Sequence, residues 1–482
     1  MARYFGTDGV RGLVGSELTL QMAEALGVEA VQSLGKRIIV ARDTRASGSD
    51  LANALISGVL SAGGSAIDAG VIPTPAVAML TRKMQADGGV MISASHNPPE
   101  YNGIKFFDSG GMKLSAELED RFEAALVRLA EGAGTTGHSS QQRDGQQPEA
   151  AATQAAATQA AATQATPTIS ALDEAAQSRL QLLDNSAELY IQQIVDTLSA
   201  EGLDLSGCRV ALDCAHGAAG ITSPETMRRL GAEVCAINTD YNGMDINVGC
   251  GSTNLEVLRG LVLETGADIG FSHDGDADRV LAVDAEGNYV DGDLIELICA
   301  LDLKKQGKLA KDTMVVTVMS NFGLVKAAAE QGIQLIQTDV GDSKVLAAMC
   351  DGGYIIGGEP SGHTIFLDYN TTGDGLVTAL CLLKAVRQSG RSLTELSQVM
   401  QRYPQVLLNV RVSDKDAVTN NPELQAAMEA AQQKLGDQGR ILLRASGTEP
   451  LFRVMVEASS EATAQEIAEG LVEVVKKLDG AE

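Results

Sequence analysis

The chain has 482 residues, of which 44% are hydrophobic, so it is long enough to form several domains with sizeable cores. Its formal net charge of −26 at pH 7 argues against nucleic acid or an anionic membrane as its main partner. Its seven cysteines are scattered without a Cys-x-x-Cys pair, which argues against a disulfide framework or a zinc site.

The N-terminal segment carries no apolar signal region, and no run of about 18 apolar residues occurs anywhere in the sequence. We therefore expect a cytoplasmic protein with no membrane partner. Because aromatic residues make up only 3% and Trp is absent, the cores must consist of Ala, Val, Leu and Ile.

The first part of the chain alternates short apolar runs with helical patterns. Apolar residues at helical spacing follow Thr19, which can cap a helix, and Ser47 with Asp50 has the pattern of a capping box. We expect strands at residues 37–41, 66–71 and 90–92. This alternation predicts a mainly parallel sheet covered by helices on both faces.

The stretch 91–107 presents a serine at the rim of that sheet. The apolar strand ends in small polar residues and an Asn-Pro turn, and we expect a second turn at Asn102-Gly103. His96 directly follows Ser95, and Lys105 comes ten residues later. A serine flanked by a base or a cation can be a covalent nucleophile or phosphoryl carrier, although an ordinary polar loop is the alternative.

Residues 131–170 interrupt the pattern. They are rich in Gly, Ser and Gln, and they contain the pentapeptide Ala-Ala-Thr-Gln-Ala three times between Ala151 and Ala165. The repeat lacks large apolar residues and cannot bury a core. We interpret the segment as a flexible insertion or linker.

The alternation of strands and helices resumes at residue 184. Further strands are expected at residues 209–213, 233–237, 268–271, 280–283, 313–319, 334–338 and 354–357. The order then changes to a strand at 406–412, a helix at 424–435, strands at 440–443 and 452–457, and a helix at 464–477. The sequence thus predicts three α/β domains at 1–183, 184–292 and 293–403, and a smaller α+β domain at 404–482.

Three aspartates at alternate positions, Asp274, Asp276 and Asp278, lie between two predicted strands. Their carboxylates can turn toward one hard divalent cation, and three protein ligands leave room for a phosphate oxygen, which favours Mg²⁺ over Ca²⁺. A solvated acidic turn is the alternative, but repulsion among three close carboxylates calls for a cation. Arg279 follows directly and can pair with a substrate oxygen.

Two further loops suit a phosphosugar. The loop at 357–363 offers the side chains of Glu359, Ser361 and His363, which match the hydroxyls of a sugar. The loop at 444–450 combines hydroxyls, a glycine and guanidinium groups in the manner of a phosphate cradle, although a plain β-turn is the alternative. One serine loop, one metal loop, one polyol loop and one phosphate loop, each on its own predicted domain, describe phosphoryl transfer on a phosphosugar.

Six stretches resemble the α-D-phosphohexomutase superfamily, and the resemblance covers nearly the whole chain. They are Phe-Gly-Thr-Asp-Gly-Val-Arg-Gly at 5–12, Ser-Ala-Ser-His-Asn-Pro at 93–98, Asp-Cys-Ala-His-Gly at 213–217, Gly-Cys-Gly-Ser-Thr at 249–253, and the loops at 274–279 and 444–450. The resemblance implies four domains around a central cleft, with mixed sheets and a mobile last domain. It also implies interconversion of glucosamine 6-phosphate and glucosamine 1-phosphate through a phosphoserine and a 1,6-bisphosphate.

The resemblance assigns roles residue by residue. The implied catalytic residues are Ser95, His96, Lys105 and Arg279. The implied metal ligands for one Mg²⁺ per subunit are Ser95, Asp274, Asp276 and Asp278. The implied substrate-binding residues are Arg11, Glu359, Ser361, His363, Arg444, Ser446, Gly447, Thr448 and Arg453. Glucosamine or glucose 1,6-bisphosphate is the expected activator, and a homodimer is left open.

Two positions depart from the family pattern. Pro360 stands where the family usually has Gln, and Ser343-Lys344 follows a Gly-Asp pair that is usually followed by Arg-Tyr. Both lie in the predicted third domain, so phosphoglucomutase or phosphomannomutase activity on the same fold is an alternative. A phosphosugar-binding protein without catalysis is a second alternative.

Overall fold

The computed structural model describes residues 4–6, 9–134, 169–446 and 450–479. The pentapeptide repeat, most of the segment 131–170, Gly447 and Thr448 lie outside these residues. Within the described ranges, no helix is both long and apolar enough to cross a membrane.

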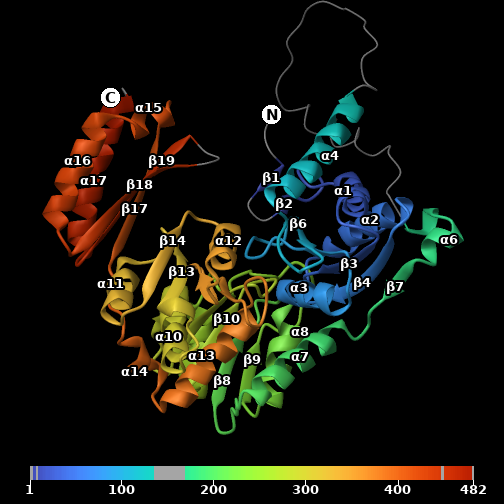
Figure 1. Ribbon diagram of the computed structural model, residues 1–482, viewed down its shortest axis with the longest axis horizontal. Helices are drawn as coiled ribbons and strands as arrows, with labels where there is room; N and C mark the ends of the chain where they lie inside the picture. Colours follow the sequence, from blue (N-terminus) through green and yellow to red (C-terminus); the bar gives the residue numbers. More distant parts are fainter. Residues whose placement is uncertain (1–3, 7–8, 135–168, 447–449, 480–482) are drawn as a thin grey trace, which may run out of the picture.

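The first sheet has seven strands in the order β1-β2-β6-β5-β3-β4-β7 (Figure 1). They are β1 (Phe5–Gly6), β2 (Gly9–Leu13), β3 (Arg37–Arg42), β4 (Ser65–Val71), β5 (Gly88–Ile92), β6 (Tyr101–Asp108) and β7 (Leu180–Leu182). Strands β5, β3, β4 and β7 are parallel to one another, whereas the pairs β1–β2, β2–β6 and β6–β5 are antiparallel. The sheet is therefore mixed and not mainly parallel, because the short loop 93–100 returns the chain directly from β5 into β6.

Helices cover both faces of this sheet. They are α1 (Leu20–Ser33), α2 (Gly48–Ser61), α3 (Thr74–Lys83) and α4 (Ala116–Gly134). Ile38 and Val40 of β3 share a core with α1, α2 and α4, while Ile39 and Ala41 share another with α3. The alternating side chains of one strand thus fill both layers, as expected for a strand buried on both faces.

Two local predictions in this region are wrong. Ser47 makes no side-chain cap, because its backbone is helical and an N-cap residue needs a non-helical backbone; its Oγ instead accepts from Nδ2 of Asn102 at 2.9 Å. Asn102-Gly103 is not a turn but part of β6. At Gly103 a Cβ would lie 2.5 Å from the Ser93 oxygen, so the glycine serves close packing of the strand. The cap at Thr19 is confirmed, since its side chain accepts from the Met22 amide.

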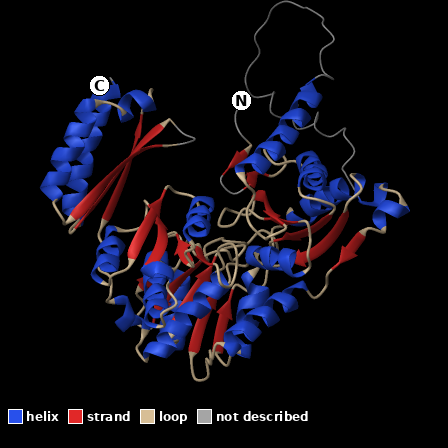
Figure 2. Cartoon of the chain, viewed as in Figure 1, coloured by secondary structure: helices blue, strands red, loops and turns tan. Residues whose placement is uncertain are grey.

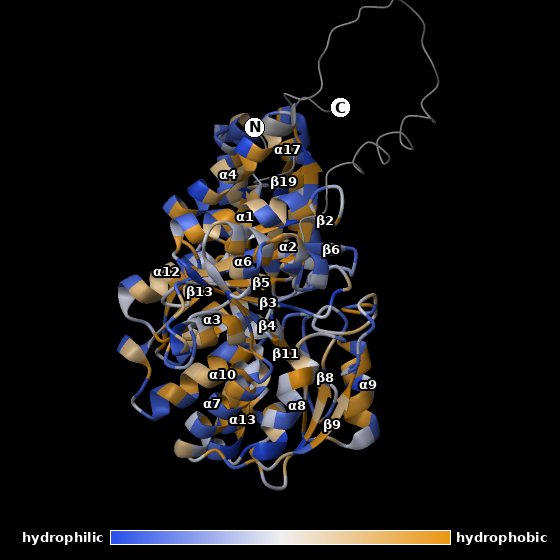
Figure 3. Ribbon diagram, turned by 90° about the vertical axis from the view of Figure 1, so that its right-hand side faces the viewer, coloured by the Kyte–Doolittle hydropathy of each residue, from blue (hydrophilic) through white to orange (hydrophobic). Residues whose placement is uncertain are grey.

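The second and third sheets are smaller. The second, in the order β12-β11-β10-β8-β9, contains β8 (Arg209–Asp213), β9 (Glu233–Ile237), β10 (Ile269–His273), β11 (Val280–Asp284) and β12 (Tyr289–Val290). The third, in the order β14-β13-β15-β16, contains β13 (Thr313–Thr317), β14 (Gln334–Thr338), β15 (Ile356–Gly358) and β16 (Thr364–Phe366). Figure 3 shows β8 and β9 coloured mainly as hydrophobic. One continuous core joins both sheets to the α3 side of the first.

Helices flank these two sheets. Those near the second are α7 (Ser186–Ala200), α8 (Ala219–Arg229) and α9 (Glu256–Thr265). The shorter α6 (Glu174–Gln177) and the 3-10 turn η2 (Ile169–Ala171) precede them in the chain and pack on α2 of the first unit. Those near the third are α10 (Gly292–Lys305), α11 (Phe322–Glu330), α12 (Asp342–Gly352), α13 (Gly375–Ser389) and α14 (Leu393–Ser397), with the 3-10 turn η3 (Ala310–Asp312).

The described residues of the last part of the chain form a separate unit, in which helices pack on a three-stranded antiparallel sheet (Figure 2). Its elements are β17 (Gln405–Arg411), β18 (Gly439–Ala445), β19 (Leu451–Ala458), α15 (Lys415–Thr419), α16 (Pro422–Leu435) and α17 (Glu461–Asp479). It has its own hydrophobic core. The predicted architecture of three α/β units and one α+β unit is confirmed.

Candidate active site

Ser95 lies in the loop that follows the fully buried strand β5, with its side chain turned to the unit of the second sheet. Its Oγ donates to Oδ2 of Asp274 at 2.5 Å, and its amide donates to Oγ of Ser93 at 2.9 Å. Nδ1 of His96 lies 3.4 Å from the same Oγ. Burial, together with the charges of Arg279 and Arg11, lowers the pKa of His96 to about 4, so its ring is neutral at pH 7.

The three aspartates come together in the loop between β10 and β11. Asp274, Asp276 and Asp278 are all buried, and a ligand atom from each lies within 4.8 Å of the others. Nζ of Lys105 lies 2.8 Å from Oδ2 of Asp276 and 3.1 Å from Oδ2 of Asp278. Lys105 reaches them from β6, because β6 pairs with β5, the strand that leads into the Ser95 loop.

The electrostatics of this cluster fit a bound cation. Burial and the neighbouring Asp278 and Asp276 raise the pKa of Asp274 well above its usual range. Burial acts in the same direction on Asp278, but Lys105 and His363 outweigh it and hold the pKa of that carboxyl well below its usual range. Among the described residues, Oδ1 of Asp276 and Oδ1 of Asp278 are buried without a hydrogen-bond donor. Three buried carboxylates with spare oxygens are a donor set suited to Mg²⁺.

The loop between β15 and β16 faces the metal loop. Ser361 Oγ donates to Glu359 Oε2 at 3.4 Å, and Val280 of β11 donates its amide to the Gly362 oxygen at 3.1 Å. Gly362 has φ of 89°, and a Cβ there would lie 2.3 Å from the Val280 oxygen, so only glycine permits this contact. The loop is therefore fixed against the strand that leaves the aspartate cluster.

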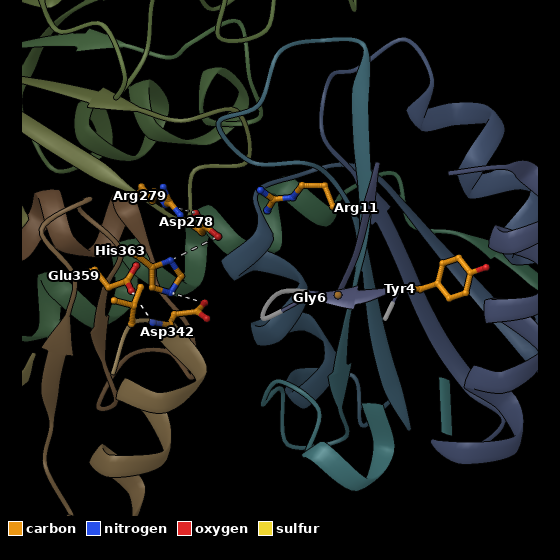
Figure 4. A pocket seen from close by; sticks show the side chains of 11 residues that line it. Tyr4, Gly6, Arg11, Asp278, Arg279, Asp342, Glu359 and His363 are labelled. Atoms are coloured by element: carbon orange, nitrogen blue, oxygen red, sulfur yellow. Dashed lines mark hydrogen bonds and ion pairs between the residues drawn. The ribbon is translucent and has the colours of Figure 1, made fainter. Parts of the chain in front are cut away.

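His363 connects this loop to two carboxylates. Its Nδ1 lies 3.7 Å from Oδ2 of Asp278, and its Nε2 lies 3.3 Å from Oδ2 of Asp342 (Figure 4). Burial alone would lower the pKa of His363, but these two carboxylates outweigh it and raise the pKa above its usual value. Lys113, from the first sheet's unit, forms an ion pair with the same Asp342 oxygen.

A cavity of about 430 Å³ opens between these loops and the N-terminal strands. Figure 4 shows Arg11 on one side and Arg279, Glu359 and His363 on the other. The residues that line the cavity are Tyr4, Gly6, Gly9, Arg11, Asp278, Arg279, Val340, Gly341, Asp342, Glu359 and His363. Guanidinium groups for phosphate and polar groups for hydroxyls thus surround one space beside the metal loop.

None of the described residues of the predicted phosphate loop lines this cavity. Arg444 on β18 lies opposite Arg453 on β19, and the Ser446 amide donates to the Leu451 oxygen at 2.8 Å. The unit that carries them stands apart from the N-terminal sheet (Figure 1). The structure therefore brings together predicted residues of the first three units, whereas the described predicted residues of the fourth, Arg444, Ser446 and Arg453, do not line the cavity.

Three contributors to the site were not predicted. Arg45 and Asn247 hold the backbone of the serine loop, and Thr74 donates its Oγ1 to Oδ2 of Asp276 at 2.7 Å. None of them belongs to a motif that the sequence analysis identified. Asp342 also lines the cavity. It belongs to the Gly341-Asp342 pair, which drew attention in the sequence only because Ser343-Lys344 follow it.

Four family models match the chain. They are the phosphoglucomutase/phosphomannomutase alpha/beta/alpha domains I at residues 2–132, II at 188–287 and III at 291–403, and the C-terminal domain at 407–474. Among curated proteins, the phosphoglucosamine mutase of Clostridium tetani is 46% identical over 99% of both chains. That of Thermobifida fusca is 48% identical over 99% of this chain and 98% of its own.

The chain belongs to the phosphoglucosamine mutase family, within the phosphohexomutase superfamily. Solved structures of phosphohexomutases share its fold. A phosphoglucomutase/phosphomannomutase family protein from Burkholderia thailandensis has a TM-score of 0.74 at 22% identity, over 99% of this chain and 98% of that one. N-acetylphosphoglucosamine mutase from Aspergillus fumigatus, in complex with GlcNAc-6P and magnesium, has a TM-score of 0.67 at 18% identity, over 99% and 96%.

Proposed function

We propose that the protein interconverts glucosamine 6-phosphate and glucosamine 1-phosphate by phosphoryl transfer through Ser95. One observation carries this proposal: the buried Ser95 Oγ lies 2.5 Å from Asp274, within the cluster of three aspartates beside the cavity. A transferable phosphate needs such a hydroxyl next to a cation site. Relatives at 46–48% identity carry the name of this activity.

The reaction needs two phosphoryl transfers. The phosphate on Ser95 passes to the free hydroxyl of the sugar phosphate: the Ser95 O–P bond breaks, a sugar O–P bond forms, and the proton of the sugar hydroxyl ends on the Ser95 Oγ. The 1,6-bisphosphate then reorients in the cavity and its other phosphate passes to Ser95: that sugar O–P bond breaks, the Ser95 O–P bond re-forms, and the Ser95 hydroxyl proton ends on the sugar oxygen. Neutral His96 can accept a proton beside Oγ, while Lys105 and Arg279 offset the charge of the phosphates.

The aspartate cluster is the proposed magnesium site. Asp274, Asp276, Asp278 and the phosphate on Ser95 would hold one Mg²⁺, consistent with the spare carboxylate oxygens. When bound, the ion neutralises charge on the transferring phosphoryl group. We also propose that glucosamine or glucose 1,6-bisphosphate loads Ser95; the A. fumigatus enzyme has been solved in complex with glucose 1,6-bisphosphate.

The remaining predicted residues would bind the sugar and its other phosphate. We assign the sugar hydroxyls to Glu359, Ser361 and His363. We assign the non-reacting phosphate to Arg444, Ser446, Gly447, Thr448 and Arg453, and a further substrate contact to Arg11, which donates to Asn97 of the serine loop. Because no described residue of the C-terminal unit lines the cavity, this assignment requires that unit to close over bound substrate. A cytoplasmic setting, as a monomer or a homodimer, suits this function.

Substrate comparison tests the activity. Purified protein with Mg²⁺ and a trace of bisphosphate should turn over glucosamine 6-phosphate faster than glucose or mannose 6-phosphate, and Ser95→Ala should be inactive. A preference for glucose or mannose would instead support a phosphoglucomutase or phosphomannomutase. Turnover by Ser95→Ala at a near-normal rate would contradict the proposal.

A second test addresses the metal. Asp276→Asn removes one anionic ligand, so we expect kcat to fall by about 10²-fold or more and the Mg²⁺ concentration for half-maximal rate to rise. The matched control is Asp268→Asn, which alters a half-exposed aspartate just before β10. An unchanged Mg²⁺ titration in Asp276→Asn would exclude this residue as a ligand.

A further inference from the structure

The backbone of Ser95 lies in the left-handed region, with φ of 52°. Residues other than glycine are uncommon there, and they persist only where their surroundings hold the strained backbone in place. The Ser95 side chain is committed to Asp274. The contacts that hold the loop must therefore act on its main chain.

Arg45 provides one set of these contacts. Its side chain is buried in the segment between β3 and α2, and its Nε donates to Oδ2 of Asp43 at 2.9 Å. The four remaining N–H groups go to main-chain oxygens of the serine loop and of Tyr101 at the start of β6, so all five donors are used. The acceptors are the oxygens of Ser95, Asn97, Pro98 and Tyr101.

Asn247 provides the second set of contacts, and it belongs to the unit of the second sheet. It lies between β9 and α9, and its Nδ2 donates to the oxygens of Ser95 at 2.9 Å and Asn97 at 3.1 Å. These are the same two oxygens that accept from Nη2 of Arg45. Asn247 itself has φ of 61°, and its amide donates to the Ala215 oxygen at 3.0 Å.

The loop that carries Asn247 is tied to both sides of the site. The Ala46 amide donates to the Gly243 oxygen at 3.0 Å, which joins this loop to the Arg45 segment. The Ser252 amide donates to the His273 oxygen at 2.9 Å, directly before the aspartate cluster. The second unit therefore contacts the serine loop twice, at its main chain through Asn247 and at Oγ through Asp274.

We propose that Asn247 is a positioning residue for phosphoryl transfer, which holds the main chain of the serine loop at the distance from the aspartate cluster that the transfer requires. This inference rests on the proposed function. Within the described residues, Asn247 does not line the cavity, so it acts through Ser95 and not on the sugar. Misplacement of a reacting group by about 1 Å can cost about 10²-fold in rate.

The test is Asn247→Gly, because glycine accepts the left-handed backbone while the amide is removed. Arg45 still holds both oxygens, so we expect the protein to fold. The kcat for glucosamine 6-phosphate should fall by about 10- to 100-fold, with KM changed by less than about two-fold. Single-turnover transfer from glucosamine 1,6-bisphosphate to dephosphorylated Ser95 should slow by the same factor as kcat.

Two companion variants make the test specific. Asn247→Asp keeps the size of the side chain but turns a carboxylate toward two carbonyl oxygens, so kcat should fall at least as far; it decides the question if Asn247→Gly does not fold. Asn254→Ala removes a bond from the same region to the Gly249 oxygen and should behave like the wild type.

The outcomes separate the two claims. A wild-type kcat in Asn247→Gly, an effect on KM alone, or an equal loss in Asn254→Ala would overturn the positioning role. Absence of turnover in the wild-type protein itself, after loading with bisphosphate, would contradict the proposed function instead.

Discussion

At the residue scale, the site concentrates buried charge that is only partly neutralised. Lys105 contacts two of the three aspartates, while Asp274 has the Ser95 hydroxyl and the Arg279 amide as its partners. Arg279 itself is held near Asp278, with Nε 3.9 Å from Oδ1. Such a cluster is costly without a cation, which is the physical reason for placing magnesium there.

Asp293, at the start of α10, gives a prediction about pH. Burial and the nearby Asp291 raise its pKa to about 7, and its Oδ2 accepts from the Asn321 amide at 2.6 Å. The folded state thus holds this proton more tightly than the unfolded chain, whose aspartates titrate near 4. The contribution of Asp293 to stability therefore falls as pH rises from about 4 through about 7.

We expect Asp293→Asn to remove this pH dependence, because the amide keeps an oxygen for Asn321 and carries no charge. The free energy of unfolding above pH 7 should rise by on the order of 2 kcal/mol. Urea unfolding at pH 5 and pH 8 measures it, with Asp268→Asn as an exposed control. The same loss of stability between these pH values in variant and wild type would refute the assignment.

At the scale of elements, the C-terminal sheet is attached to the third unit through β19. The buried Glu457 accepts from Nδ2 of Asn321 at 2.9 Å, from the Phe322 amide at 3.1 Å and from Nε of Arg440 at 2.5 Å. Arg440 also donates to the Ser320 oxygen. One carboxylate thus joins β18, β19 and the start of α11.

Arg440→Met should weaken this junction. The variant keeps the apolar stem but leaves Glu457 buried without its cation, which costs about 3–5 kcal/mol for a buried pair. The expected result is a lower urea midpoint and faster hydrogen exchange in β17–β19. Lys434→Met, which breaks an exposed pair with Glu466, should cost less than about 1 kcal/mol. Equal effects of the two substitutions would show that the junction contributes little.

At the scale of the whole molecule, the architecture and most site residues could be predicted because their signals are local. Buried strands β5, β10 and β15 each end in a loop with the functional side chains, and hydrophobic pattern and loop composition mark such places in the sequence. The carboxylates of Asp274, Asp276 and Asp278 are close in space because they are close along the chain.

The rest depends on packing between units. Asn247 lies 152 residues from Ser95, and no sequence pattern reveals that contact. The capping box predicted at Ser47 is also absent, and the Ser47 oxygen instead accepts a hydrogen bond from Asn102 of β6, a contact between residues far apart in the chain. The boundaries between units also depend on packing rather than on a local sequence signal. We propose that the units meet at residues 183/184, 292/293 and 403/404. Limited proteolysis can test these positions.

The central claim is that Ser95 carries the transferred phosphate. Its most direct test is intact mass and peptide mapping of the purified protein after incubation with glucosamine 1,6-bisphosphate and Mg²⁺. We expect one added phosphate on the peptide that contains Ser95, and its loss to the sugar when glucosamine 6-phosphate is added. A protein that takes up no phosphate, or carries it on another residue, would contradict the account.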